Sequence, residues 1–301
     1  MADTCVVALD VGGTRMKAGL VGDGAHVITV SMYDTGREDG PGAVTERLVS
    51  VVQRLTDNAR ERGLRPSGAG VVIPGIIDEG SGVVRNSANI GWRDFPLRGH
   101  LAQHIDLPVA IGHDVRAGGL AESVLGAGQG ERDMLFLPLG TGIAAAMIMD
   151  GRPFSGNGYG GEIGHMQIDP KGTVCGCGAR GCLETISSAS AVSRRYSERA
   201  GAETSAAEVA RRVQTREPLA MEIWQDCTDG LATAMLAYMS ICAPAQIVVG
   251  GGLAESGETL LAPVRAAVER RMTFHRPVRI VRAALGDRAG LLGAALLGRT
   301  A

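Results

Sequence analysis

Short apolar runs of strand length, separated by glycine-rich turns, open the chain. These runs predict β-strands at residues 5–9, 16–21 and 27–32, with a glycine loop at the corner between the first two. Residues 43–62 carry apolar side chains at helical spacing, and residues 68–73 form a further apolar run. The pattern therefore predicts three turn-linked strands, followed by a helix and a fourth strand.

A similar pattern returns in the second half of the chain. Residues 134–139 predict a strand, which a Gly-Thr-Gly loop connects to a second strand at residues 143–149. Two halves that each open with a strand, a Gly/Thr loop and another strand suggest an internal duplication. The other expected elements are strands at residues 107–111, 246–249 and 279–283, helices at 117–125, 260–271 and 289–297, and a mainly helical region at 189–238.

The order of these elements predicts two domains with a boundary near residues 114–118. We expect the first domain to span residues 1–115 and to take back a C-terminal helix at about residues 287–301. The second domain is expected to cover residues 116–286. A chain of 301 residues is long enough for two domains of ordinary size.

Composition and charge argue against two classes of partner. Hydrophobic residues make up 45% of the chain and charged residues 21%, which is typical of a globular protein. A net charge of −2 without a basic block, and an aromatic content of 3%, argue against nucleic acid and anionic membranes. The longest apolar stretch, residues 231–243, is too short to span a bilayer, and no secretory signal pattern is present. We therefore expect a cytoplasmic protein, in which Cys5, Cys227 and Cys242 are buried thiols.

The other three cysteines form a cluster. Cys175, Cys177 and Cys182 lie within eight residues, and His165 precedes the first of them by ten. Three thiolates and one imidazole make a tetrahedral zinc set. Because these four ligands leave no open coordination position, the sequence predicts a zinc ion that is not itself the catalyst.

Two carboxylates flank the cysteine cluster. Glu162 precedes His165 by three residues, and Glu184 follows Cys182 by two. Such carboxylates could support the metal ligands or accept hydrogen bonds from the hydroxyls of a polyol, and the second ring nitrogen of His165 is available for the same purpose. The alternative is that the four metal ligands only fasten a loop.

The first glycine loop is a candidate phosphate site. In the run Asp10-Val-Gly12-Gly13-Thr14, followed by Arg15, glycine amides can approach a phosphate closely and the threonine hydroxyl can donate to it. Asp10 could hold Mg²⁺ through water. An ordinary hairpin turn explains the same residues equally well.

Two later glycine runs are weaker candidates. Gly140, Thr141 and Gly142 repeat the glycine-threonine pattern, for which a turn is the simpler interpretation. Gly251 lies in a triple-glycine run after an apolar strand, where it could lie against a nucleotide base or form a plain strand-to-helix loop.

Asp114 follows a predicted strand and stands beside His113. A carboxylate at a strand end suits a general base that takes a proton from a hydroxyl group. Aspartate is also a common N-cap, and a helix is expected from residue 117. Position alone favours the cap.

Together these residues resemble the ROK family of bacterial sugar kinases and sugar-responsive repressors. The defining segment is Glu162-x-Gly-His165 followed by Cys175-Gly-Cys177-Gly-x-x-Gly-Cys182-x-Glu184. The remaining motifs follow in the order of the family: Asp10-x-Gly-Gly-Thr14, Pro74-Gly75, Asn89-Ile-Gly-Trp92, Gly140-Thr-Gly142 and Gly250-Gly251-Gly252. The resemblance implies an α/β fold of the actin-like, hexokinase type, with two α/β domains around a cleft and a zinc-binding loop.

The resemblance also implies roles for individual residues. ATP phosphates and Mg²⁺ would be held by Asp10, Gly12, Gly13, Thr14, Arg15, Gly140, Thr141 and Gly142, with Gly251 near the adenosine. Asp114 would be the catalytic base on the sugar hydroxyl. The sugar would be bound by Gly75, Asn89, His113, Asp114, Glu162, His165 and Glu184. Zinc would be bound by His165, Cys175, Cys177 and Cys182.

The chain departs from the family pattern around the proposed base. The family usually has Asn-Asp-Ala-Asn, whereas this chain has His113-Asp114-Val115-Arg116. The usual first Asn contacts a sugar hydroxyl, and histidine is larger and can titrate. The departure leaves the identity of the sugar open. Arg15, where lysine is frequent, keeps the positive charge.

The sequence therefore predicts an ATP-dependent hexose kinase, with glucose and its 6-phosphate as the first candidate pair. Kinases for N-acetylmannosamine, N-acetylglucosamine, fructose or allose are alternatives, and polyphosphate could replace ATP. A sugar-sensing regulator of the family would carry a DNA-binding domain ahead of the first glycine loop, which here begins at residue 10. As in other family members, we expect a homodimer or homotetramer with sugar and ATP as its small-molecule partners.

Overall fold

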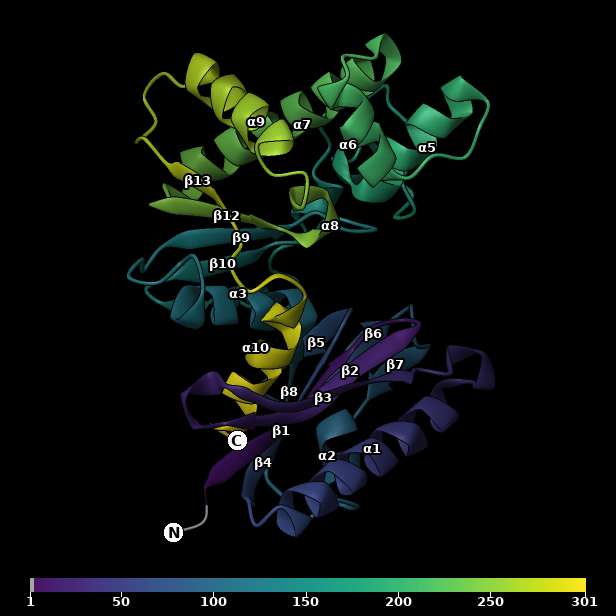
Figure 1. The fold of residues 1–301 in the computed structure, drawn as a ribbon, viewed down its shortest axis with the longest axis vertical. Coiled ribbons are helices and arrows are strands. Elements are labelled where there is room, and N and C mark those ends of the chain that lie inside the picture. The colour runs from purple at the N-terminus through teal and green to yellow at the C-terminus, as the bar shows by residue number, and fades with distance from the viewer. Residues whose placement is uncertain (1–2) are drawn as a thin grey trace. The chain divides into compact units, whose positions relative to one another are not determined.

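The computed structural model of the protein describes residues 3–301, which divide into two compact units (Figure 1). Unit 1 runs to Ala121 and also contains Pro153–Gly160 and Asp287–Ala301. Unit 2 consists of Glu122–Arg152 and Gly161–Gly286. The segment Pro153–Gly160, which the sequence pattern placed in the second domain, thus belongs to unit 1.

A five-stranded sheet forms the centre of unit 1. Its strands are β1 (Thr4–Val11), β2 (Arg15–Gly22), β3 (Val27–Asp34), β4 (Arg65–Ile73) and β8 (Val109–His113). The strand order is β3-β2-β1-β4-β8. The first three strands form an antiparallel meander because short turns join them, whereas β4 and β8 run parallel to β1 after longer connections.

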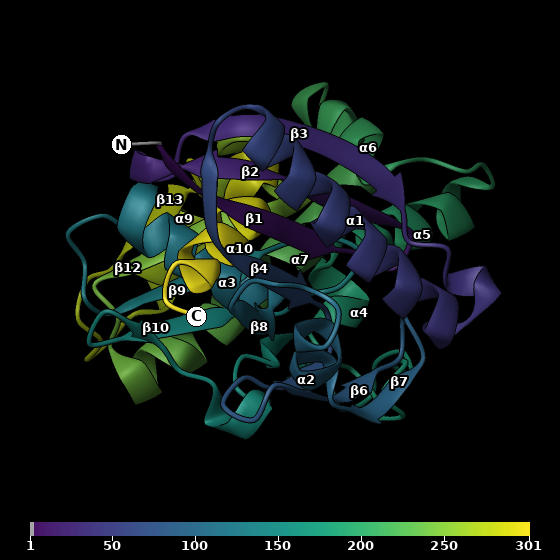
Figure 2. The same ribbon diagram turned by 90° about the horizontal axis from the view of Figure 1, so that it is seen from below.

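Side chains alternate between the two faces of this sheet, as the period of a strand requires. Val7, Leu9 and the other odd-numbered positions of β1 pack with helix α1 (Pro41–Glu61) in one buried cluster. The opposite face is covered by helix α10 (Ala289–Gly298), the yellow helix of Figures 1 and 2. The C-terminal segment therefore completes the core of unit 1.

Glycines let α10 lie very close to the sheet. A Cβ atom at Gly70 would overlap the carbonyl oxygen of Ala294, and one at Gly68 would overlap that of Gly298. Because α10 itself is rich in alanine and glycine, the two backbones can approach without a gap. The small-residue composition of the last helix is thus matched by its partner strand.

A second, smaller sheet in unit 1 has no counterpart in the expected elements. It contains β5 (Ile76–Asp78), β6 (Val83–Ser87) and β7 (Trp92–Phe95) in the order β5-β6-β7, and helix α2 (Leu97–Ala102) follows it. These strands are short and interrupted by polar residues, so the sequence shows no clear period of two there. The turn between β6 and β7 carries Asn89.

The main sheet of unit 2 repeats the topology of the first. Its strands are β9 (Met134–Pro138), β10 (Ala146–Met149), β11 (Arg152–Pro153), β12 (Gln246–Gly250) and β13 (Arg279–Arg282), in the order β11-β10-β9-β12-β13. Both sheets therefore have three strands in sequence order followed by two that run parallel to the first. This shared order supports the internal duplication that the two Gly/Thr loops suggested.

Helices supply most of the core of unit 2. They are α4 (Glu184–Ser187), α5 (Ala189–Ala200), α6 (Ala206–Gln214), α7 (Pro218–Cys242), α8 (Gly251–Ala254) and α9 (Glu258–Arg271). The long helix α7 is apolar over much of its surface and packs among α5, α6 and α9. Short 3₁₀ turns occur in the chain at Asp23–Ala25, Arg37–Asp39, Gly156–Gly158, Ile163–His165 and Gly286–Arg288.

Helix α3 (Asp114–Leu125) contains the boundary between the units. Just past that boundary Glu122 is fully buried, and its carboxylate accepts backbone N–H groups of Ala127, Ala284 and Leu285 at 2.8–3.1 Å. These bonds fasten the end of α3 to a distant part of unit 2 and satisfy the buried charge. Among residues 3–301, we find no helix long and apolar enough to cross a membrane.

Candidate functional site

Three predicted site residues of unit 1 lie at the carboxyl ends of parallel strands. Asp10 lies near the end of β1, Gly75 just after β4, and Asp114 just after β8. The register pairs Asp10 with Val72 and Ile73 with His113, so these strands end at the same edge of the sheet. In open α/β sheets, ligands bind at the carboxyl ends of the strands. Unit 1 therefore gathers the three residues at its expected ligand-binding edge.

The surroundings of Asp10 disfavour the charged form of its carboxyl group. Its pKa is raised to about 7, mainly by burial and further by the negative charge of Asp114, while Lys17 acts in the opposite direction. A Cβ atom at Gly290 would fall 2.2 Å from Asp10 Oδ2, so this carboxylate lies against the first turn of α10. Two neighbouring carboxylates with one partial counter-charge are a donor set that a hard divalent cation fits.

The loop after Asp10 is a tight turn, and Thr35 from a later segment is hydrogen-bonded to it. The Gly12 N–H donates to the Arg15 carbonyl at 2.9 Å. Thr35 binds the same loop twice, through its hydroxyl to the Gly12 carbonyl at 2.7 Å and through its N–H to the Thr14 carbonyl at 2.9 Å. The Asn89 side chain lies against Gly13, with Asn89 Cβ 3.3 Å from the position that a Cβ would take. The phosphate-loop candidate and Asn89 thus meet.

Asp114 is the first residue of α3, and its side chain is 29% exposed. Asp114 Oδ1 accepts the N–H of Val115 at 2.7 Å and lies 3.4 Å from His113 Nδ1. An N-cap side chain accepts the backbone N–H of a residue two or three positions later. His113, not Asp114, fits this description, because its Nδ1 lies 3.4 Å from the backbone nitrogen of Arg116. Only one carboxylate oxygen of Asp114 has a local backbone bond, which leaves room for a second role.

The metal-ligand candidates of unit 2 converge. The ligand atoms of His165, Cys175, Cys177 and Cys182 all lie within 4.8 Å of one another. Cys177 Sγ is 3.7 Å from Cys182 Sγ, and Cys175 Sγ is 3.6 Å from His165 Nδ1. Tetrahedral zinc with bonds of about 2.3 Å to sulfur and about 2.0 Å to nitrogen separates two sulfurs by about 3.8 Å and a sulfur–nitrogen pair by about 3.5 Å. The donor set therefore fits zinc in both chemistry and spacing.

A local turn structure produces this convergence. Val174 pairs with Arg180 as an isolated bridge, and the Cys175 N–H donates to the Ala179 carbonyl at 2.7 Å. Gly181 has a φ of +69°, and a Cβ atom there would overlap the carbonyl oxygen of Asp169. Glycine is required at such a position, which explains the glycine that precedes Cys182 in the motif.

The flanking carboxylates lie beside the cluster. Glu184 Oε1 accepts from the Cys175 thiol at 3.0 Å and is 3.6 Å from His165 Nδ1, while Glu162 Oε2 is 3.9 Å from His165 Nε2. The imidazole therefore has one nitrogen toward the sulfurs and the other toward Glu162. Glu184 also faces the second glycine loop, because its Oε2 lies 3.2 Å from the position of a Cβ at Gly142.

The glycine loops of unit 2 also meet one another. The Leu139 N–H donates to the Gly250 carbonyl at 2.9 Å, and the Leu253 N–H donates to the Leu139 carbonyl at 3.1 Å. Gly251 has a φ of +77°, and a Cβ there would collide with the backbone of Leu139. The Gly140 carbonyl accepts the first N–H of α5, so Leu139 and Gly140 together connect the start of this loop to β12, α8 and α5.

Cavities in unit 2 coincide with several of these residues. One of about 700 Å³ is lined by Thr141, Gly142, Cys175, Glu184 and neighbouring residues. Another, of about 400 Å³, is lined by Glu162 and His165 and is otherwise mainly apolar. The polar side chains among the predicted site residues therefore line cavities in which they can contact a ligand.

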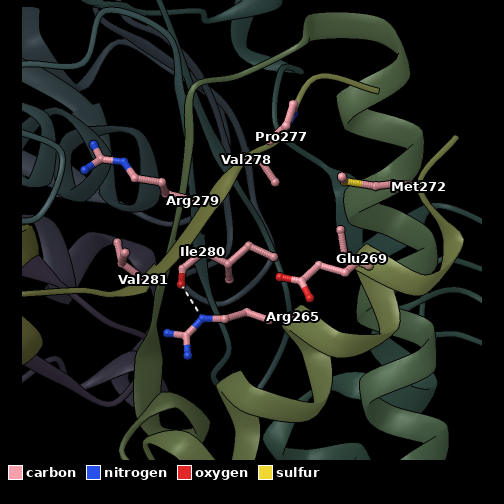
Figure 3. A pocket seen from close by; sticks show the side chains of 9 residues that line it. Arg265, Glu269, Met272, Pro277, Val278, Arg279, Ile280 and Val281 are labelled. Atoms are coloured by element: carbon pink, nitrogen blue, oxygen red, sulfur yellow. Dashed lines mark hydrogen bonds between the residues drawn. The ribbon is translucent and has the colours of Figure 1, made fainter. Parts of the chain in front are cut away.

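A cavity of about 440 Å³ between α9 and β13 lies apart from the predicted residues (Figure 3). Strand β13 is the edge of its sheet, and Arg265 Nε donates to the Ile280 carbonyl there at 2.8 Å. Glu269 and Met272 face the strand from α9 (Figure 3). A helix that covers an edge strand and binds one of its carbonyl groups hinders that strand from pairing with other chains, so this feature has a structural explanation.

The motif analysis missed Glu79 and Thr35, which support the candidate site. Thr35 binds the first glycine loop as described above, and Glu79 pairs with the buried Arg116. Glu79 could have been sought from the sequence, since a buried arginine requires a counter-charge. Nothing in the local pattern around Thr35 indicates its contact with a loop twenty residues away.

Comparisons with known proteins agree with these motifs. The model of the ROK family matches residues 6–301. The chain is 31% identical to the glucokinase of Halalkalibacterium halodurans, over 97% of this chain and 94% of that protein. It is 32% identical to the N-acetylmannosamine kinase of Escherichia fergusonii, over 97% of each chain.

A solved structure gives the same result for the fold. The ROK family glucokinase of Streptomyces griseus, in complex with glucose and AMPPNP, matches with a TM-score of 0.84 at 27% identity, over 99% of this chain and 100% of that one. The α/β fold class expected from the resemblance is thereby confirmed. Because the family model and the relatives span nearly the whole sequence, the chain belongs to the ROK family.

Proposed function

We propose that the protein is an ATP-dependent sugar kinase that phosphorylates a hexose, with conversion of glucose to glucose 6-phosphate as the first candidate reaction. The observation that carries the proposal is the placement of Asp10, the glycine loop and Asp114 at one strand edge of unit 1. Family membership and the kinases among its relatives support the same reaction.

Asp114 is proposed as the general base. Its carboxylate would accept the proton of the attacking sugar hydroxyl while that oxygen bonds to the γ-phosphorus of ATP. The bond from the γ-phosphorus to its bridging oxygen breaks, and ADP leaves with the electron pair. Phosphoryl transfer depends mostly on positioning and charge neutralisation, so a single placed base is sufficient protein chemistry.

The glycine loops are proposed to hold the nucleotide. Gly13 and Thr14 would offer backbone amides and a hydroxyl to phosphate oxygens, and Arg15 would add positive charge. Gly12, whose own N–H is bonded to the Arg15 carbonyl, would keep the turn close to the phosphates. Gly140–Gly142 would bind further phosphate oxygens, with Gly251 against the adenosine. Asp10 would help to hold Mg²⁺, which when bound neutralises the charge of the phosphates.

The cysteine cluster is proposed to position residues that bind the sugar. Zinc on His165, Cys175, Cys177 and Cys182 would fix the loop without taking part in the reaction, because the four ligands fill its coordination shell. Glu162, Glu184 and the second nitrogen of His165 would then accept or donate hydrogen bonds to sugar hydroxyls. Gly75, Asn89 and His113 are proposed as further sugar contacts from unit 1.

A coupled ADP-release assay with a panel of hexoses tests the proposal. We expect turnover with MgATP for at least one hexose, and parallel reactions with polyphosphate identify the phosphoryl donor. Absence of turnover with every hexose and MgATP would contradict the kinase assignment.

Phosphorylation of an N-acetylated hexosamine is the second candidate. It is supported by a relative that is an N-acetylmannosamine kinase, and His113, which stands where the family usually has asparagine, leaves the identity of the sugar open. His113→Asn should shift the ratio of kcat/KM between glucose and the preferred sugar. An unchanged ratio would mean that His113 does not select the sugar.

A further inference from the structure

Arg116 is the largest side chain that the protein buries completely, with 1% of its surface exposed. Arginine is almost never buried without a partner. The residue stands two positions after Asp114, where the family pattern has asparagine. Its guanidinium must therefore find acceptors that the usual residue would not need.

The guanidinium finds acceptors on several segments of unit 1. Arg116 Nε donates to Glu79 Oε1 at 3.0 Å, and Nη2 lies 3.4 Å from the Ile77 carbonyl. Nη1 lies 3.4 Å from the carbonyl oxygens of both Gly158 and Gly160. One side chain thus connects α3, the segment around β5 and the segment Pro153–Gly160.

Glu79 extends this network to the proposed base. Its Oε1 also accepts the backbone N–H of His113 at 3.1 Å. His113 directly precedes Asp114, so the Arg116–Glu79 pair holds the end of β8 from which the base projects.

The segment that Arg116 binds leads into the proposed sugar loop. Gly160 is followed by Gly161 and then by Glu162, so the carbonyl groups bound by Arg116 lie just before the first sugar candidate. Gly158 has a φ of +95°, and a Cβ there would lie 2.7 Å from the Ile77 carbonyl oxygen. These close contacts explain why Pro153–Gly160 packs with unit 1 although its sequence neighbours belong to unit 2.

We infer that Arg116, paired with Glu79, is a positioning residue for the sugar-phosphorylation site, an inference that rests on the proposed function. It fixes the backbone next to the base and, within the same unit, the segment Gly158–Gly160, which precedes Glu162 in the sequence. Asparagine has a single short amide and cannot bind four acceptors on two segments. At the position of the family asparagine, this chain therefore has a longer side chain that anchors the backbone next to the base and the segment Gly158–Gly160.

Steady-state kinetics of Arg116→Gln and Arg116→Lys test the inference, with Arg98→Gln as the matched control. Arg98 binds carbonyl groups of the same Glu79–Gly80 turn but contacts neither Gly158 nor Gly160. We expect the Arg116 variants to lose about 10- to 100-fold in kcat/KM for the sugar, because displacement by about 1 Å costs rate at that scale. The KM for ATP should change less than about twofold, and the control should behave as the wild type.

A readout that needs no turnover accompanies the kinetics. Hydrogen exchange of peptides covering residues 156–162 should accelerate in both Arg116 variants and in Glu79→Gln, but not in Arg98→Gln. Glu79→Gln should reproduce the kinetic loss, and its combination with Arg116→Gln should cost less than the sum of the two.

Two results would overturn the inference. One is a lower unfolding temperature of the Arg116 variants with unchanged kcat and sugar KM, which would indicate a purely structural ion pair. The other is unchanged hydrogen exchange over residues 156–162. If instead the wild type phosphorylates no sugar, the proposed function fails, while the exchange measurement still decides whether Arg116 anchors the segment.

Discussion

At the scale of single residues, the carboxyl group of Asp10 makes the protein's stability depend on pH. Burial and the charge of Asp114 raise its pKa from 3.8 to about 7 in the folded state. Between these values the folded protein holds a proton that the unfolded chain releases. Stability should therefore fall as pH rises from about 4 to about 7 and then level off.

Asp10→Asn should remove this dependence. The variant resembles the protonated form, so in magnesium-free buffer it should match the wild type near pH 4 and be more stable near pH 8. The gain is on the order of 2–4 kcal/mol, from about 1.4 kcal/mol for each unit of pKa. Thermal unfolding across this pH range measures it, and parallel curves for the two proteins would contradict the electrostatic account.

At the scale of elements, the turn around Cys175 lacks a regular secondary structure that could hold it. Backbone bonds such as Cys175 to Ala179 are local, and the pairing of Gln167 with Cys182 is only an isolated bridge. A metal that joins four side chains contributes folding energy directly in such a loop. The loop that carries Glu162, His165 and Glu184 should therefore depend on zinc.

Cys177→Ser should lose bound zinc and raise the KM for sugar at least about tenfold, since loss of metal support commonly costs 10–100-fold. Zinc content by elemental analysis and sugar KM are the two measurements. Cys242→Ser is the control and should retain both, because Cys242 lies outside the cluster and is partly exposed, not the buried thiol that the sequence predicts. Full activity after complete zinc removal would show that the metal does not position the loop.

At the scale of the whole molecule, the sequence predicts the regular elements and the positions of the motifs. It does not predict the side chains from distant segments that hold the site in place. The hairpin strands and α1 were predictable because each has a clear period and a turn signal at its end. Helix α10 was predictable from its unbroken run of small and apolar residues. The convergence of His165 with the three cysteines was predictable because zinc geometry constrains a short segment.

The remaining features depend on contacts that local sequence does not encode. Strands β5, β6 and β7 are too short and polar to show a period. The segment Pro153–Gly160 joins unit 1 through Arg116 and Ile77, which are distant in sequence. Position alone favours Asp114 as the cap of α3, whereas the geometry gives that position to His113, because the helix begins earlier than its apolar pattern indicates.

The central claim, that Asp114 is the base of an ATP-dependent sugar kinase, is tested most directly by one comparison. Sugar phosphate formed from MgATP by the wild type and by Asp114→Asn is measured by mass spectrometry, alongside sugar affinity by calorimetry. We predict product with the wild type, a loss of at least about 100-fold in the variant, and sugar affinity within a few fold. Near-normal product formation by Asp114→Asn would contradict the account.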